Sequence, residues 1–311
     1  MSTEEPSASE NQNSPQLLNQ WIEIQESLKK QLITDDRFSW KLPPICNGQT
    51  YEGAQDDRDS DRGKFLKYIG GADLSFSKAD PSIACATLVV LDASTLEVVH
   101  EVSNTVELRV PYVPGFLAFR EAPVLLELLE KLKNTALQLY PQVLMVDGNG
   151  LLHPRGFGLA CHLGVLADLP TIGIGKNVSP FSYDVTRRML ASVLKNYCLC
   201  HSSNTLKVCY NNCQLHHVDG LTQHGVRQLL EANGDSCSDV FTLMGDSGST
   251  LGAALRSTVG SLKPIFISVG HRISLASAIE IVKLSCRYRI PEPIRQADIR
   301  SRDCLRKHGL S

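Results

Sequence analysis

The chain has 311 residues, of which 42% are hydrophobic and 21% are charged, and this is enough apolar sequence for one large globular domain with appendages. Its 31 Lys and Arg residues nearly balance its 33 Asp and Glu residues, so the overall charge gives no steering toward nucleic acid, and any polyanion site must be local. The longest apolar runs fall far short of the roughly 20 residues that span a bilayer, and the N-terminus lacks a signal pattern, which argues against a membrane or secretory role.

The ten cysteines are scattered and form no compact disulfide framework. In a chain without an export signal, such cysteines are expected to be reduced thiols, which indicates an intracellular protein. We expect the cytoplasm, with the nucleus or nucleolus as alternatives.

The N-terminal part is predicted to lie outside the main fold. Residues 1–16 are rich in Ser, Glu, Asn and Pro and are predicted to be a disordered tail. Residues 17–64 are predicted to form a helix, from an apolar stripe that includes Trp21 and Leu28, followed by an exposed connector with the acidic run QDDRDSDRG.

The main domain is predicted to span residues 65–293 and to be mixed α/β. Short β-rich runs over 67–76, 82–92 and 96–108 predict an antiparallel meander. Helical and strand patterns then alternate through residue 175, which predicts parallel βαβ units in the same sheet, flanked by helices.

Two segments stand apart from this pattern. A variable Cys-rich insert is predicted around residues 195–237, and its cysteines and histidines favour free thiols over a zinc site because a standard CxxC pair is lacking. Residues 294–311 are predicted to be a basic C-terminal tail, either solvated or in contact with backbone phosphate.

Three carboxylates occupy positions that suit a metal site. Asp147 ends the apolar strand VLMVD, Asp73 interrupts the strand YIGGADLSF, and Glu121 begins the helix after the PYVPGF turn. Since ligands bind at the carboxyl ends of strands in open α/β sheets, these acids are predicted to converge on a cation, and oxygen ligands suit Mg²⁺, with Mn²⁺ as the alternative. The structural interpretation, in which the acids cap turns or pair with arginines, stays open at this point.

Glycines and basic residues surround the same positions. Gly148 and Gly150 remove side chains beside Asp147, as a close approach of backbone to a flat ligand or a phosphate would require. Basic side chains near strand ends suit a polyanionic substrate, although each would also be ordinary on the surface. These basic residues are His153, Arg155, Lys176 and His271.

The motifs GADLSF, PYVPGFLAFRE, VDGNGLLHPRGFG, GIGK and SVGHRISL together resemble the endonuclease V family, metal-dependent nucleases that act near inosine. The resemblance covers most of the predicted domain. It implies a ribonuclease-H-like fold, metal-binding acids at Asp73, Glu121 and Asp147, and basic site positions at His153, Lys176 and His271. The family's strand-separating wedge matches Pro111, Tyr112, Val113 and Pro114, and its base pocket matches Leu117, Gly148 and Gly150.

The resemblance also implies an activity. Members cut the second phosphodiester on the 3′ side of the lesion and leave a 3′-hydroxyl and a 5′-phosphate. Several segments look closer to eukaryotic members, which favours inosine in single-stranded RNA as the substrate of a monomeric enzyme. A deoxyinosine-specific DNA repair enzyme is the alternative, and a non-catalytic inosine-nucleic-acid binding module is the second.

Two other motifs point elsewhere and are set aside. MGDSGS is similar to the nucleophile segment of chymotrypsin-like proteases, but His271 follows Ser247, which is the wrong order, and Asp246 is instead an additional candidate acid for the metal site. GIGKN lacks the first glycine and the Ser or Thr of a phosphate-binding loop, so NTP hydrolysis is not expected.

Overall fold

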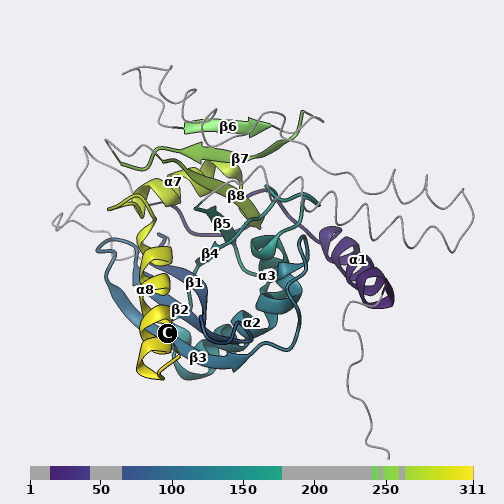
Figure 1. Ribbon diagram of the computed structural model, residues 1–311. Helices are drawn as coiled ribbons and strands as arrows, with labels where there is room; N and C mark the ends of the chain where they lie inside the picture. Colours follow the sequence, from purple (N-terminus) through teal and green to yellow (C-terminus); the bar gives the residue numbers. More distant parts are fainter. Residues whose placement is uncertain (1–14, 43–64, 177–239, 245–247, 259–262, 311) are drawn as a thin grey trace, which may run out of the picture.

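The computed structural model describes residues 15–42, 65–176, 240–244, 248–258 and 263–310 (Figure 1). The Cys-rich insert and Asp246 lie outside the described residues, as do most of the predicted N-terminal tail and the acidic connector. The predicted N-terminal helix is present as α1 (Pro15–Lys29). Within these described ranges, no helix is both long and apolar enough to cross a membrane.

One eight-stranded mixed sheet forms the centre of the molecule, and the prediction of a mixed α/β fold is confirmed (Figure 1). Its strand order is β3-β2-β1-β4-β5-β8-β7-β6. The strands are β1 (Tyr68–Phe76), β2 (Ile83–Asp92), β3 (Val98–Glu107), β4 (Val143–Asp147), β5 (Thr171–Gly175), β6 (Val240–Met244), β7 (Thr250–Leu255) and β8 (Ile265–His271). The first three form the expected antiparallel meander, and β4 and β5 then add to β1 in parallel.

The second half of the sheet reverses direction. β8 pairs with β5 antiparallel, and β7 and β6 continue antiparallel beyond it. The carboxyl end of β8 therefore lies level with the amino ends of β4 and β5, at the opposite end of the strands from their carboxyl ends. This reversal decides which predicted site residues can meet.

Helices cover both faces of the sheet, which explains why β2 and β4 are apolar along nearly their whole length. On one face, α2 (Leu117–Thr135) and α3 (Leu159–Ala167) pack leucines against Leu144 and Val146 of β4. On the other face, α7 (Leu275–Leu284) and α8 (Glu292–Lys307) meet a second core that contains Met145 and Ile172. A short 3₁₀ turn, Leu137–Leu139, follows α2.

The segment predicted to be a basic C-terminal tail is instead mostly the helix α8, which lies across β1 and β2 (Figure 1). Its buried residues Ile294, Ala297 and Leu305 recur at helical spacing and form an apolar stripe. The many arginines of this segment concealed that stripe in the sequence, since they occupy the remaining helix faces.

The close approach of α8 to the sheet depends on a glycine of the GGAD motif. A Cβ atom added at Gly71 would lie 2.1 Å from the Pro293 carbonyl oxygen, a contact that no side chain can make. Gly71 therefore lets the first turn of α8 rest directly on β1, two residues from Asp73.

We predict that Gly71→Ala destabilises the protein more than Gly70→Ala. At Gly70 the nearest atoms to an added Cβ belong to side chains, led by Leu144 Cδ1 at 2.8 Å, whereas at Gly71 the two nearest are backbone atoms of Pro293. Overpacking against backbone should cost about 2–3 kcal/mol in urea-induced unfolding, and the Gly70 variant should lose less. Equal losses in the two variants would contradict this account of how α8 is seated.

Candidate active site

Two carboxylates meet on adjacent parallel strands. The register of β1 and β4 pairs Ala72 with Val146, which places Asp73 and Asp147 level with each other at the next position. Because side chains alternate along a strand, both acids share a face with Met145, which belongs to the core on the α8 side. The sheet therefore forces two negative groups together beneath α8.

The protonation of Asp73 reflects this crowding. Burial, followed by the hydrogen bond and the charge of Asp147, raises the pKa of Asp73 from 3.8 to about 7. The hydroxyl of Ser301, on α8, donates to Asp73 Oδ2 at 2.8 Å. Without a cation, the folded protein therefore keeps a proton on Asp73 well above the pH at which an exposed aspartate ionises.

A third carboxylate, Asp298, comes from α8. Within the described part of the chain, Asp73, Asp147 and Asp298 each offer an oxygen, and these oxygens lie within 4.8 Å of one another. We call these three residues the acid cluster. The side chains of Asp147 and Asp298 are 23% and 22% exposed, so the cluster is open to solvent and to substrate.

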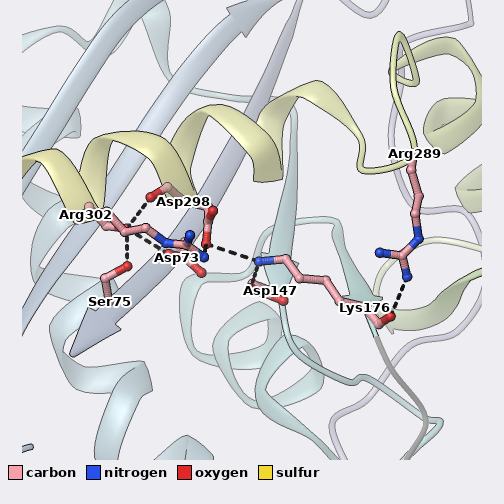
Figure 2. Close-up of polar contacts among 8 residues, drawn as sticks. Asp73, Ser75, Asp147, Lys176, Arg289, Asp298 and Arg302 are labelled. Atoms are coloured by element: carbon pink, nitrogen blue, oxygen red, sulfur yellow. Dashed lines mark hydrogen bonds and ion pairs between the residues drawn. The ribbon is translucent and has the colours of Figure 1, made fainter. Parts of the chain in front are cut away.

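Lys176 balances this negative charge. Its Nζ lies 2.6 Å from Asp147 Oδ2 and 3.3 Å from Asp298 Oδ1, so that one ammonium group bridges two members of the cluster (Figure 2). Burial acts to lower the pKa of Lys176, but the charges of Asp147, Asp73 and Asp298 raise it overall. The lysine is held at the end of β5, where Arg289 donates to its carbonyl oxygen at 2.7 Å.

Glu121 lies beside the acid cluster, although it is not one of its three members. It is buried at the start of α2, and burial followed by the charges of Asp73 and Asp147 raises its pKa to about 8. The predicted metal-binding set was Asp73, Glu121 and Asp147. The structure brings Asp298 into the tight cluster and leaves Glu121 as a neighbouring carboxyl.

The donor set of the acid cluster fits a hard divalent cation. All the donors are carboxylate oxygens, which Mg²⁺ and similar ions prefer over nitrogen or sulfur ligands. Burial first, and then Asp147, raise the pKa of Asp73 even though the charge of Lys176 acts to lower it. A bound cation would favour the ionised form of the carboxylates and would leave the lysine available for a phosphate group.

His271 is not near the acid cluster, contrary to the sequence-based expectation. It pairs with Thr171, the first residue of β5, whereas Lys176 follows the last residue of that strand. With about 3.3 Å per residue over the five residues from Thr171 to Lys176, the separation along the sheet between His271 and Lys176 is on the order of 16 Å. Its imidazole Nδ1 accepts a hydrogen bond from the Ile33 amide at 3.2 Å. The expectation failed because β8 runs antiparallel to β5.

Arg155 was predicted to face the substrate phosphate, but the structure assigns it a packing position. Its side chain is buried, contacts Gln25 and Glu26 of α1, and lies over the Phe116 ring at 5.4 Å. The neighbouring His153 is half-buried, and burial, together with the nearby positive charges, lowers its pKa to about 3. These surroundings favour the neutral form of the His153 imidazole, and its role toward a phosphate stays a prediction.

The predicted wedge and base-pocket positions follow β3 and β4. Within the segment Pro111–Pro114, the Tyr112 side chain is 62% exposed, as an inserting tip requires. Leu117 is half-buried at the start of α2. Gly148 directly follows Asp147, whereas a Cβ at Gly150 would meet the Val269 carbonyl oxygen at 2.0 Å. Close backbone packing thus suffices to explain Gly150, and its role toward a base stays a prediction.

Asp298 is the functional residue that the sequence interpretation missed. It lies within residues 294–311, which were predicted to be a basic tail and not part of the metal site. The available signal was the apolar stripe of Ile294, Ala297 and Leu305, which predicts a packed helix and places Asp298 at the border of its buried face.

The fold and the site together define a class of protein. Carboxylates that can share a divalent cation at the carboxyl ends of parallel strands, with a lysine beside them, are the arrangement of a cation-dependent phosphodiester hydrolase. Comparison with known proteins gives the family. The Endonuclease V family model matches residues 52–214 and 220–299.

Individual relatives agree with the family model. The human protein named Endonuclease V is 42% identical over 294 residues, which cover 93% of this chain and 84% of that protein. The structure of the human Endonuclease V catalytic domain aligns with a TM-score of 0.72 at 40% identity and covers 95% of this chain and 99% of that one. The chain therefore belongs to the Endonuclease V family of nucleases.

A third comparison bears on the ligand of a relative. The structure of Ciona intestinalis Endonuclease V, with a TM-score of 0.70 and 28% identity, covers 94% of this chain and 99% of that one. It is a complex with a 23mer DNA that contains an inosine followed by a ribo-adenosine.

The raised pKa of Glu121 predicts that, in EDTA, the protein becomes less stable as the pH rises. The unfolded chain releases this proton near pH 4.5, whereas the folded protein retains it to about pH 8. Since the folded state binds more protons between these values, the free energy of unfolding falls as pH rises through this window. The Tm of Glu121→Gln minus the Tm of the parent should therefore increase by about 5 °C from pH 5 to pH 8.5.

The matched control is Glu130→Gln, an exposed position on the same helix. Its Tm difference from the parent should stay constant over the same pH range. A Glu121→Gln difference that is also constant would show that Glu121 is not held protonated by its surroundings.

We predict that His271→Ala affects stability and leaves catalysis nearly intact. The side chain is buried at the edge of the sheet away from the acid cluster, so its removal should cost about 1–3 kcal/mol in urea unfolding. Cleavage by the folded variant should remain within about threefold of the parent, while Lys176→Ala should lose on the order of 100-fold. Equal losses of kcat/KM in both variants would place His271 back in the reaction.

Proposed function

We propose that this protein is a Mg²⁺-dependent endoribonuclease that cuts inosine-containing single-stranded RNA at the second phosphodiester 3′ to the inosine, leaving a 3′-hydroxyl and a 5′-phosphate. The observation that carries the proposal is the acid cluster with Lys176 at the open ends of β1, β4 and β5. Membership of the Endonuclease V family supports the reaction class.

The preference for RNA draws support from one relative. The nucleic acid bound by the Ciona relative carries a ribose directly after the inosine, and a 2′-hydroxyl is the group by which a protein distinguishes RNA from DNA. A deoxyinosine-specific DNA endonuclease is the alternative, since the rest of that ligand is DNA.

In this mechanism Asp73, Asp147 and Asp298 would hold a Mg²⁺ ion, which would supply charge stabilisation for the phosphate and for the departing 3′-oxygen. Lys176, released from its bridge between two carboxylates, pairs with a non-bridging phosphate oxygen. Glu121 lies close enough to sense the charge of both strand acids. A bound cation would favour the ionised form of Glu121, and its carboxylate would then orient the attacking water and accept a proton from it.

Recognition of the lesion is assigned to the loops around this centre. Tyr112, at the exposed tip of the segment Pro111–Pro114, separates the flipped base from its neighbour, and Leu117 and Gly148 border the base. We further propose that the enzyme acts as a monomer and that it is cytoplasmic, with nuclear and nucleolar pools as alternatives.

Replacing Asp147 by Asn should reduce cleavage of inosine RNA at least 1000-fold, roughly the loss expected when a cation ligand is removed, while binding changes little. Asp73→Asn should behave alike, and EDTA should abolish cleavage until Mg²⁺ is restored. Single-turnover cleavage of end-labelled RNA and fluorescence anisotropy measure the two properties. Full activity in either variant would overturn the cation assignment.

The same assay separates the alternatives when matched inosine RNA, inosine DNA and unmodified strands are compared. Faster cutting of inosine RNA supports the proposal, and preference for inosine DNA supports the repair enzyme. Inosine-specific binding without a cut product would identify a non-catalytic binding module instead.

A further inference from the structure

A groove opens beside the acid cluster, between the end of β1 and α8. Its volume is about 590 Å³, within the size range of ligand pockets. We call it the α8 groove. It is lined by Ser75, Phe76, Lys78, Asp298, Ile299, Arg302, Leu305 and Arg306.

The lining of the α8 groove combines positive charge with apolar surface. Lys78 is exposed, and the Arg302 and Arg306 side chains are each 65% exposed. Between these cations, the Phe76 and Ile299 side chains present 38% and 37% of their surface. Cations that follow a phosphate backbone, next to an aromatic ring and apolar surface for sugars and bases, are the features of single-strand nucleic-acid sites.

The groove is continuous with the acid cluster. Asp298 belongs to both, and the guanidinium of Arg302 donates to Asp298 Oδ1 at 2.8 Å (Figure 2). A strand whose phosphate reaches the acid cluster therefore has a positively charged channel available immediately beyond it.

The position of the groove indicates which part of the bound nucleic-acid strand it holds. It lies on the α8 face of the sheet, whereas α2, with Leu117 at its start, covers the other face. If the inosine is held by Leu117 and Gly148, a cut on its 3′ side sends the downstream strand away from α2 and along α8. This step rests on the proposed function.

We propose that the α8 groove binds the single-stranded segment 3′ to the scissile phosphate, with Lys78, Arg302 and Arg306 on backbone phosphates and Phe76 against a base or sugar. After cleavage the same groove holds the product strand that begins with the 5′-phosphate.

The test compares the variant Lys78→Ala/Arg306→Ala with the parent on two inosine RNAs. One RNA extends about eight nucleotides beyond the scissile bond, long enough to follow a basic groove, and the other ends about one nucleotide beyond it. Arg302 is left intact because it contacts Asp298. The double variant should raise KM for the long RNA about tenfold at nearly constant kcat, and should leave KM for the short RNA unchanged. The salt dependence of KM for the long RNA should weaken by a slope of about two.

Arg300→Ala is the matched control, since Arg300 lies on the same helix and bonds to Glu101 on β3. It should leave KM for both RNAs unchanged, and thermal melting should show that all variants are folded. Two results would overturn the groove assignment. One is an equal effect of the double variant on both RNAs, and the other is an effect that depends on the length of RNA on the 5′ side of the inosine. A parent enzyme that does not prefer inosine RNA would instead overturn the proposed function, so the two failures are distinguishable.

Discussion

The repulsion between Asp73 and Asp147 is the constraint around which this site is built. The parallel register of β1 and β4 brings the two carboxylates level on one face, where burial makes their charges costly. Burial and Asp147 raise the pKa of Asp73, Ser301 donates a hydrogen bond to Asp73, and the ammonium group of Lys176 pairs with Asp147. A divalent cation can take the place of these stabilising groups. The crowding of carboxylates that is unfavourable without a cation is therefore also the reason why the site would bind one.

The helix α8 packs the last part of the chain against β1, the first strand of the sheet in the sequence. Gly71 lets the helix approach β1 closely, and the helix then delivers Asp298 and Ser301 to the acid cluster and Arg302 to the adjoining groove. Stability and chemistry are therefore coupled here, because whatever loosens α8 from the sheet also removes one carboxylate and the hydrogen-bond donor of another.

Positive charge in this protein has several unrelated uses. Lys176 balances the acid cluster, Arg155 joins the loop after β4 to α1, and the arginines of α8 line a groove next to the cluster. Lys176 and Arg155 both lie within motifs of the family, although only Lys176 contacts the acid cluster. Only their burial and their partners separate a residue that can reach a phosphate from one that cannot.

The sequence by itself determined the mixed α/β class, the first five strands, the positions of Asp73 within a strand and of Asp147 and Lys176 at strand ends, and the resemblance to endonuclease V. These follow from local periodicity and motif order, which are readable along the chain. Tertiary structure alone decided that Asp298 joins the acid cluster, that His271 lies at the far edge of the sheet and that Arg155 is buried. The physical reason is that strand direction and helix docking are set by long-range packing, and an antiparallel β8 cannot be distinguished from a parallel one by its own seven residues.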